Sequence, residues 1–224
     1  MRVEAIVVAA GSGSRMRSET KKPYIRLQGV PLLIHTLRAL QTCDLIERFV
    51  VVTAGEDRTY AEELIRKHMY GSFQLVSGGA ERQDSVRCGL AAISEDTDVL
   101  LVHDAARPFV NAEEVRNVIE AAWQTGAATL GTPVKDTIKE VENGTVVRTL
   151  PRHKLFAIQT PQAFHPSLLR EAHHQALAEG VQVTDDASLI EWLGKPVAII
   201  PGSYRNIKIT TPEDLVIAEA FLQS

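Results

Sequence analysis

The sequence AAGSGSRM follows an apolar run near the N-terminus and contains residues that could bind phosphate. Glycine lets the backbone come close to a ligand, and the N–H groups of such a loop can point at phosphate oxygens. Arg15 stands within this loop, and Lys22 follows seven residues later. Fixed N–H dipoles together with two cations suit a triphosphate, so we expect Gly11, Ser12 and Gly13 to cradle phosphate groups. A structural turn with two solvated cations is the alternative.

Two familiar nucleotide-binding patterns do not fit this loop. The dinucleotide fingerprint G-x-G-x-x-G needs a third small residue, but Met16 stands at that place. No acidic residue follows about 20 residues later to hold a ribose. The P-loop G-x-x-x-x-G-K-[ST] is absent as well, because Arg17 stands six positions after Gly11 and no glycine precedes it. The loop therefore indicates phosphate binding of another kind.

A second group of polar residues lies in the sequence VHDAARPF, at the end of another apolar run. Ligands of parallel α/β sheets bind beyond the carboxyl ends of the strands, where Asp104 is expected to lie. Its carboxylate could bind a metal ion or substrate hydroxyl groups, or it could hold Arg107. A structural Asp–Arg ion pair without a ligand is the simpler interpretation.

The elements that must position these residues alternate between strands and helices along most of the chain. Runs rich in Val, Ile and Leu predict buried strands at residues 3–9, 48–53, 73–76, 98–103, 127–132 and 197–200. Apolar residues at helical spacing, together with capping and proline signals, predict helices at residues 31–42, 59–69, 82–93, 111–125, after 166, at 185–193 and from 211. This order predicts an α/β fold with a mostly parallel sheet and helices on both faces.

The pattern changes in the middle of the chain. Two strand-like stretches, 136–141 and 145–150, flank the sequence Glu-Asn-Gly, and Asn-Gly between strands is a strong hairpin signal. A hairpin inserted into an α/β layout often projects from the body. We therefore expect an arm at about 135–155 within a single domain spanning 1–224. The arm's apolar residues favour a subunit contact in a homodimer, and a hairpin packed on its own domain is the alternative.

Composition narrows the classes of protein to consider. The 224 residues include 24 Lys and Arg against 28 Asp and Glu, a net charge of −4. Nucleic-acid binders usually need a basic field, so no nucleic-acid partner is expected. No apolar run approaches the roughly 20 residues that span a bilayer, so no membrane partner is expected. Cys43 and Cys88 show neither pairing nor metal spacing, which favours a reducing, cytoplasmic location.

Taken together, the motifs resemble those of the methylerythritol phosphate cytidylyltransferases of the non-mevalonate isoprenoid pathway. The resemblance covers nearly the whole chain in the family's order, through AAGSGSRM (9–16), GGAERQDSV (78–86), VHDAARPF (102–109), PVKDTIK (133–139), QTPQAF (159–164), TDDAS (184–188) and NIKITTPEDL (206–215). The first motif alone marks only the wider group of sugar-nucleotide transferases. The later motifs are much narrower, and the resemblance implies a Rossmann-like nucleotidyltransferase fold.

The family's reaction joins CTP and 2-C-methyl-D-erythritol 4-phosphate to give 4-diphosphocytidyl-2-C-methyl-D-erythritol and pyrophosphate. The nucleophile would be a phosphate oxygen, whose second pKa of about 6 leaves it ionised at neutral pH. No general base is then needed, which agrees with the lack of a Ser–His–Asp-like arrangement. Catalysis would consist of alignment and of charge neutralisation at the α-phosphorus, with Mg²⁺ bound together with CTP. The sequence assigns no metal ligands.

The resemblance also implies roles for individual residues. Arg15 and Lys22 would stabilise the transition state, and Arg152 and Lys208 would hold and aim methylerythritol phosphate. The cytidine end would meet backbone groups and small side chains of Ala9, Ala10, Gly11, Gly79, Ser85 and Ala105. The second substrate would be lined by Asp104, Arg107, Thr160 and Thr184. In the family, Arg152 lies in or beside the arm and serves the neighbouring subunit, so the active site would be built from two chains.

Two departures from the family pattern affect these assignments. The family often has Pro-Lys-Gln-Tyr where this chain has Lys-Lys-Pro-Tyr at residues 21–24. Counting from Arg15 makes Lys22 the catalytic lysine, and Lys21 could substitute if the proline reshapes the loop. The family also often has an acid after the Gly-Gly pair, where this chain has Ala80. Any ribose or base contact of that acid's side chain is lost.

The remaining titratable residues are expected to serve packing or solvation. His35 lies on a leucine-rich helix and is expected at the surface or at an interface. His173 and His174 are expected on a solvated helix face. His103 is expected to pack at a strand end and not to act as a base, and Cys88 is expected in the core.

Three other functions stay open at this point. Ribitol 5-phosphate cytidylyltransferases resemble this family in fold and loops, but they more often carry a different dipeptide in place of Ala105-Ala106. A nicotinamide-dependent oxidoreductase would need the third glycine and the ribose acid that are missing here. A non-catalytic nucleotide-binding regulator would not need the four cations Arg15, Lys22, Arg152 and Lys208.

Overall fold

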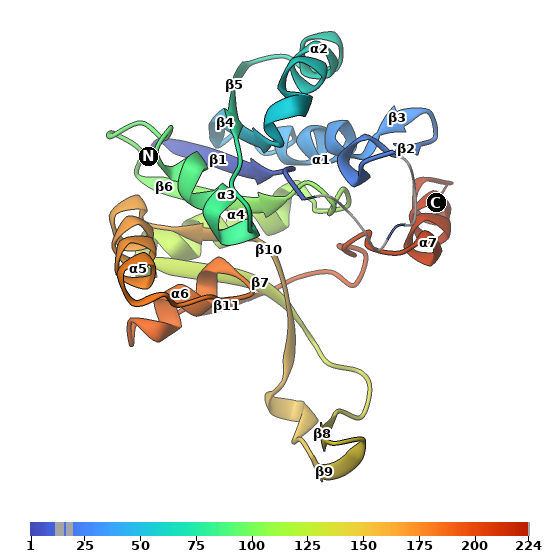
Figure 1. The fold of residues 1–224 in the computed structure, drawn as a ribbon, viewed down its shortest axis with the longest axis vertical. Coiled ribbons are helices and arrows are strands. Elements are labelled where there is room, and N and C mark those ends of the chain that lie inside the picture. Colours follow the sequence, from blue (N-terminus) through green and yellow to red (C-terminus); the bar gives the residue numbers. More distant parts are fainter. Residues whose placement is uncertain (12–15, 17–19, 224) are drawn as a thin grey trace.

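The computed structural model describes residues 1–11, 16 and 20–223 (Figure 1). Its strands are β1 (Val3–Val8), β2 (Arg26–Leu27), β3 (Val30–Pro31), β4 (Ile46–Thr53), β5 (Ser72–Ser77), β6 (Val99–Asp104), β7 (Ala127–Pro133), β8 (Lys139–Glu142), β9 (Thr145–Thr149), β10 (Phe156–Phe164) and β11 (Ala198–Pro201). Its α-helices are α1 (Leu32–Gln41), α2 (Arg58–His68), α3 (Arg82–Leu90), α4 (Ala112–Thr125), α5 (Pro166–Glu179), α6 (Asp186–Trp192) and α7 (Pro212–Gln223). Short 3-10 turns are η2 (Lys22–Tyr24), η3 (Gly55–Asp57) and η4 (Arg152–Lys154).

The main sheet is mostly parallel, which confirms the predicted α/β architecture. In the described chain its strand order is β11-β7-β10-β6-β1-β4-β5, and only β10 runs antiparallel to its neighbours. Strand β10 is absent from the predicted elements. Its sequence contains Gln159, Thr160, Pro161 and Gln162 in place of an apolar run, so hydrophobic periodicity gives no strand signal there.

Helices cover both faces of this sheet because the strand residues alternate in direction. On β1, Ala5 and Val7 pack in one core with α1, α2 and α4. Ile6 points to the opposite face and packs with α3, α5 and α6. Successive side chains of a strand point to opposite sides, so an uninterrupted apolar strand needs a helical layer on each side.

Local signals fix where several helices begin. The Asn111 side chain accepts a hydrogen bond from the backbone N–H of Glu114, and the Glu114 side chain accepts one from the backbone N–H of Asn111, so α4 begins in a capping box. Helix α5 has Pro166 at its first position. At α7, the Asp214 carboxylate accepts hydrogen bonds from the backbone of Thr210 and Thr211. These three starts agree with the sequence prediction.

The predicted hairpin is present as β8 and β9, and it extends away from the helices and the main sheet (Figure 1). Asn143 and Gly144 have positive φ angles of 48° and 78°, which the tight turn requires and which these two residue types tolerate. The apolar side chains of Val141, Val146 and Val147 are about half exposed. The arm therefore presents uncovered apolar surface within one chain.

None of the described helices combines the length and the apolar character that crossing a membrane requires.

Candidate active site

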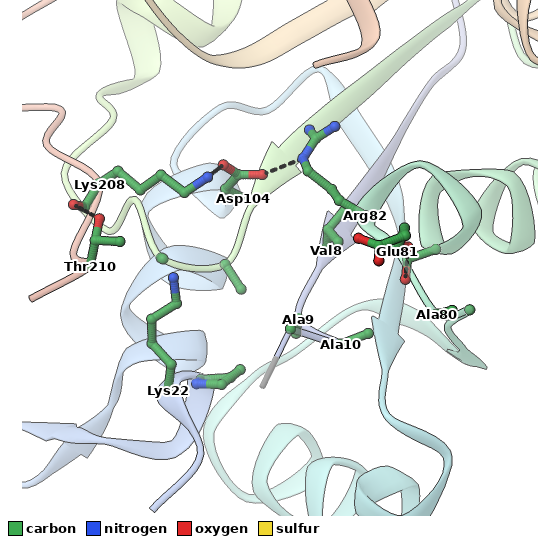
Figure 2. A pocket seen from close by; sticks show the side chains of 16 residues that line it. Val8, Ala9, Ala10, Lys22, Ala80, Glu81, Arg82, Asp104, Lys208 and Thr210 are labelled. Carbon is green, nitrogen blue, oxygen red and sulfur yellow. Dashed lines mark hydrogen bonds and ion pairs between the residues drawn. The ribbon is translucent and has the colours of Figure 1, made fainter. Parts of the chain in front are cut away.

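A cavity opens where β1 and β6 end at the carboxyl edge of the sheet, the expected ligand edge of a parallel sheet. We call it the first cavity. Figure 2 shows its side chains, which come from segments far apart in the sequence. It is lined by Val8, Ala9, Ala10, Gly11, Lys22, Pro23, Gly79, Ala80, Glu81, Arg82, Ser85, Asp104, Ala105, Ala106, Lys208 and Thr210. All the residues expected at the cytidine end therefore meet here.

Close packing of two loops shapes this end of the first cavity. The backbone N–H of Ala9 donates to Val52 O at 2.7 Å, and that of Ala105 donates to Val8 O at 3.0 Å. A Cβ atom on Gly78 would lie 2.6 Å from the Cβ of Ala10, so only glycine lets the segment after β5 approach the β1 loop this closely. We call this part of the first cavity, where the loops after β1, β5 and β6 lie close together, the slot.

The two neighbouring lysines point to different places. Lys22 lines the first cavity, and Figure 2 shows its side chain within it. Lys21 Nζ instead lies 2.7 Å from Glu56 Oε1 and 2.8 Å from Asp57 Oδ1. Hydrogen bonds to Asp57 and Glu56 raise the pKa of Lys21. The Lys-Lys-Pro-Tyr departure therefore leaves Lys22 as the lysine that faces the ligand space.

Asp104 forms ion pairs with two side chains, neither of which the sequence analysis proposed as its partner. Arg82 Nε lies 3.0 Å from Asp104 Oδ1, and Lys208 Nζ lies 2.6 Å from Asp104 Oδ2 (Figure 2). Burial opposes ionisation of Asp104, but Arg82 and Lys208 outweigh it and lower the pKa of the carboxyl group. Among the described residues the Asp104 and Arg107 side chains form no ion pair, because Arg107 Nη1 donates to Asn206 O at 2.8 Å. The Arg107 backbone N–H does donate to Asp104 O at 3.1 Å.

Arg82 is a charged site residue that sequence reasoning did not single out. Its Nη1 lies 2.7 Å from Asp186 Oδ2, so one guanidinium joins two carboxylates that are almost fully buried. Burial lowers the pKa of Arg82, but Asp186 and Asp104 outweigh this and raise it. Its position directly after the segment Gly-Gly-Ala-Glu, at the carboxyl end of a predicted strand, was the available signal.

The prediction of a solvated histidine pair is wrong for His173. Its side chain is 2% exposed, and its Nε2 lies 3.3 Å from Asp186 Oδ1. Asp186 is thereby held on one side by His173 and on the other by Arg82. His174, the next residue on the helix, is exposed as expected. The amphipathic pattern of α5 did not separate these neighbours, because a histidine suits either environment.

A second cavity adjoins the first and shares Arg82, Asp104 and Lys208 with it. Arg107, Thr160 and Thr184 line it, so all four residues expected around the second substrate meet here. The further lining residues, which the sequence did not single out, are Ile158, Gln159, Gln162, Asp185, Ser188 and Glu191. The side chains shared by the two cavities include the cations Arg82 and Lys208 beside Asp104, so the cavities can hold two anionic reactants side by side.

Other expected site residues lie elsewhere. Arg152 is exposed on η4 beside the arm, where its Nη1 donates to Lys135 O at 2.5 Å, and it lines neither cavity of its own chain. Ser12, Gly13 and Arg15 lie outside the described residues. The expectation that Cys88 lies in the core is wrong, because Cys88 is only partly buried. His35 is partly exposed, and its ring lies 2.8 Å from Leu27 O.

The described donor atoms do not fit a resident magnesium ion. Within residues 1–11, 16 and 20–223, no three or more His, Cys, Asp or Glu side chains gather as a metal site requires. Both oxygens of Asp104, the carboxylate shared by the two cavities, are engaged by Arg82 and Lys208. Mg²⁺ prefers octahedral oxygen coordination and commonly takes substrate phosphates and water as ligands. The chemistry of this donor set therefore favours an ion that arrives on the nucleotide.

His103 is buried below the site and is expected to make the fold sensitive to acid. Its Nε2 lies 3.0 Å from Arg107 O, which can only accept, and its Nδ1 lies 3.1 Å from Thr160 Oγ1. Burial lowers the pKa of His103 to about 4, so the ring is neutral at pH 7. The unfolded chain takes up this proton near pH 6.5 and the folded chain only near pH 4.

Protonation of His103 therefore does not lower the free energy of unfolding above pH 6.5. Between pH 6.5 and pH 4 it lowers that free energy by about 3 kcal/mol. Urea unfolding across this range would measure the loss. In His103→Gln, which keeps a neutral donor, the slope should be flatter. An equal slope in both proteins would contradict the assignment to His103.

Comparisons with known proteins agree with this arrangement. The family model described as 2-C-methyl-D-erythritol 4-phosphate cytidylyltransferase matches residues 3–224. A protein of that name from Halalkalibacterium halodurans is 46% identical over 223 residues, which is 99% of this chain and 97% of the relative. The solved 4-diphosphocytidyl-2C-methyl-D-erythritol synthase of Anaerococcus prevotii matches with a TM-score of 0.89 and 34% identity, over 100% of this chain and 96% of that one.

A second solved structure is similar to this chain over its full length. The crystal structure of 2-C-methyl-D-erythritol 4-phosphate cytidylyltransferase from Thermus thermophilus matches with a TM-score of 0.83 and 37% identity, over 100% of both chains. Neighbours of this kind agree with the Rossmann-like nucleotidyltransferase fold that the motifs implied. The chain belongs to the 2-C-methyl-D-erythritol 4-phosphate cytidylyltransferase family.

Proposed function

We propose that this chain transfers the CMP group of CTP to 2-C-methyl-D-erythritol 4-phosphate, giving 4-diphosphocytidyl-2-C-methyl-D-erythritol and pyrophosphate in isoprenoid precursor biosynthesis. Membership of the family supports the reaction. The observation that carries the proposal is the pair of adjoining cavities with Lys208 and Asp104 at their boundary and Lys22 in the first. One cavity suits CTP, and the other suits a smaller phosphate ester.

The bond changes need no general base. An ionised oxygen of the methylerythritol phosphate attacks the α-phosphorus of CTP and forms the new P–O bond. The bond to the bridging oxygen of the β-phosphate breaks, and pyrophosphate leaves with its electron pair. Charge on the α-phosphate and the leaving group grows during the step, so fixed cations stabilise the transition state more than the ground state.

The residues of the first cavity divide this work. Lys22, together with Arg15 of the glycine-rich loop, neutralises the charge at the α-phosphate and the leaving group, and Ser12 and Gly13 belong to the phosphate-binding part of that loop. The cytosine and ribose lie against the slot formed by Ala9, Ala10, Gly11, Gly79, Ser85 and Ala105. Main-chain groups can select cytosine because its amino group donates a hydrogen bond where uracil only accepts one.

The residues of the second cavity aim the nucleophile. Lys208, already directed into the boundary by Asp104, holds the phosphate of methylerythritol phosphate beside the α-phosphorus. Asp104, Arg107, Thr160 and Thr184 offer donors and acceptors for the phosphate and the hydroxyl groups. Mg²⁺ belongs to the substrate as MgCTP, in keeping with the donor set described above.

We further propose that the active protein is a homodimer in which the arm of one chain reaches the site of the other. Arg152 lies outside both cavities of its own chain, and Val141, Val146 and Val147 leave apolar surface open on the arm. A second copy would cover that surface and receive Arg152 at its second cavity.

The organisation of the chain follows from the same proposal. Residues 1–224 would act as one nucleotidyltransferase domain with the arm as an insertion at about 135–155. Cys43 and Cys88 are free thiols, which suits a reducing cytoplasm.

Pyrophosphate release from CTP and Mg²⁺ tests the reaction, with methylerythritol 4-phosphate and ribitol 5-phosphate supplied in parallel. We expect release with methylerythritol 4-phosphate and only background release with ribitol 5-phosphate. Release with ribitol 5-phosphate alone would keep the nucleotidyltransferase chemistry and replace the substrate. Release with neither compound would refute the proposal.

Arg152→Ala is expected to raise the KM for methylerythritol 4-phosphate by about 10–100-fold and to change the KM for CTP much less, because a charge-assisted contact to the second substrate is lost. Steady-state kinetics with each substrate varied would measure both constants. Arg148→Ala is the matched control, since Arg148 lies on the same arm and pairs with Glu140 at the surface. Equal increases in both KM values would contradict the positioning role.

A further inference from the structure

The loop that carries Lys208 also contacts the root of the arm. We call residues 202–210 the Lys208 loop. Tyr204 of this loop donates a hydrogen bond from its hydroxyl group to Pro133 O, the last residue of β7, at 2.7 Å. Lys135 Nζ lies over the Tyr204 ring, 3.4 Å from its centroid. One side chain therefore contacts two positions of the leg that leads from β7 into the arm, by a hydrogen bond and by a cation–π contact.

Buried side-chain amide groups hydrogen-bond the Lys208 loop to β10. Asn206 is fully buried, and its Nδ2 donates to Thr160 O at 2.9 Å and to Gln159 Oε1 at 3.3 Å. Gln159 Nε2 donates to Ser203 O at 2.9 Å. A buried hydrogen bond is costly to leave unmade, so this loop cannot shift freely. Tyr204 consequently rests on a rigid base that is tied to β10.

The arm itself stands on two legs, which continue from the paired strands β7 and β10 and also contact each other beyond the sheet. The backbone N–H of Val134 donates to Leu155 O at 3.1 Å, and Arg152 Nη1 donates to Lys135 O at 2.5 Å. These contacts join the two legs to each other, whereas the Tyr204 contacts join one leg to the Lys208 loop. Tyr204 contacts the arm from the side, through the same Lys135 that Arg152 contacts.

We propose that Tyr204 is a positioning residue that fixes the direction of the arm and thereby the place of Arg152 in the neighbouring subunit's site. This inference rests on the proposed function and its homodimer. A small rotation at the root of a projecting hairpin displaces its outer residues much further, and a misplacement of about 1 Å at a reacting group can be costly. Tyr204 acts on the reaction through Lys135 and Arg152 and does not itself contact the substrate.

Kinetics of single variants give the first test. Tyr204→Leu removes both contacts and is expected to raise the KM for methylerythritol 4-phosphate about tenfold, with the KM for CTP within about twofold of wild type. Tyr204→Phe keeps the ring under Lys135 and should show a smaller increase, about threefold. Tyr70→Leu is the matched control, because Tyr70 is 86% exposed at the far edge of the sheet. Parallel changes in both KM values would overturn the proposal.

Subunit mixing separates an effect through the arm from an effect within the chain's own pocket. Lys208→Ala disables the pocket of its own chain but leaves its Tyr204 and its arm intact. In a mixed dimer with Tyr204→Leu, the pocket of the Tyr204→Leu chain keeps Lys208 and receives the intact arm. We expect this pocket to recover the wild-type KM for methylerythritol 4-phosphate. Failure to recover it would show that Tyr204 acts within its own pocket and would overturn the inference.

Hydrogen exchange provides a readout that does not depend on activity. In Tyr204→Leu, the amides of Val134 and Leu155 at the arm root are expected to exchange faster, while amides of β1 keep their protection. Unchanged exchange at both root amides would overturn the positioning role of Tyr204 even if the reaction is as proposed. Conversely, a wild-type protein that releases no pyrophosphate would refute the proposed function. Faster exchange of the root amides in Tyr204→Leu would then still show that Tyr204 holds the arm root.

Discussion

Lys22→Ala is expected to lower kcat for pyrophosphate release by about 10²–10⁵-fold, because a cation that stabilises charge at the α-phosphate is lost in the transition state. CTP binding should weaken far less, since the slot around the base and ribose is unchanged. Steady-state kinetics give kcat, and calorimetric titration with MgCTP gives the Kd. A variant with near-wild-type turnover would contradict the assignment of Lys22.

The adjacent lysine supplies a demanding control for this experiment. Lys21→Ala removes a cation of the same type one residue earlier, but Lys21 is held by Glu56 and Asp57 at the start of α2. Lys21 does not line the first cavity, and its ion pairs hold it beside Glu56 and Asp57, so kcat should stay within a few-fold of wild type. If Lys21→Ala lost as much activity as Lys22→Ala, the lysine identified by geometry would be wrong.

Arg82→Leu is expected to destabilise the folded protein by about 3–5 kcal/mol, because it leaves Asp104 and Asp186 as buried carboxylates with one partner fewer. Urea unfolding at pH 7 measures the free energy. Activity should fall as well, since Asp104 without Arg82 carries more uncompensated negative charge beside Lys208 and repels an incoming phosphate. Arg82→Lys, which keeps a charge but not the fork of donors, should restore only part of both properties.

The pH dependence of the unfolding free energy of Arg82→Leu provides a further test. In the wild type, Arg82 helps to lower the pKa of both carboxyl groups, so their contribution to stability is present above about pH 4 and is lost as pH falls through the lowered values. Without Arg82 these pKa values rise, and protonation relieves the cost of the buried charges. The stability difference between Arg82→Leu and wild type should therefore narrow as pH falls through the raised pKa values of the two carboxyl groups in the variant.

Arg87→Leu is the matched control for the Arg82 experiment. Arg87 lies on the same helix, and its ion pair with Asp84 is more than one-third exposed on the arginine side. Its replacement should change the unfolding free energy by no more than about 0.5 kcal/mol. A loss under about 1 kcal/mol in Arg82→Leu would contradict the view that Arg82 holds the two buried carboxylates together.

Much of the fold could be read from the sequence because local physical signals were strong there. Uninterrupted apolar runs are typical of strands buried on both faces, and β1, β4 and β6 were found by that signal. The turn of the arm was found from Asn143-Gly144, whose positive φ angles few other residue pairs adopt. Strand β10 was not predicted, because its polar residues line the second cavity and its sequence has no apolar periodicity.

The site divides in the same way between sequence and tertiary structure. Gly11, Lys22 and Asp104 were expected at the site because loops that follow parallel strands reach the same edge of the sheet. Gly79 and Lys208 were expected there only from the family resemblance, and all five line the first cavity. The sequence also indicated phosphate binding, because backbone N–H donors and cations suit phosphate whatever the details of the fold.

Only the tertiary structure decided which charges pair with one another. Residues 82, 104, 186 and 208 are far apart in the chain, and no local pattern says that Asp104 pairs with Arg82 and Lys208 and leaves Arg107 to Asn206. The environment of His173 was settled in the same way, by α6 packing against α5. Pairing depends on distances of a few ångströms between elements, and those distances exist only after the sheet and its helices have packed.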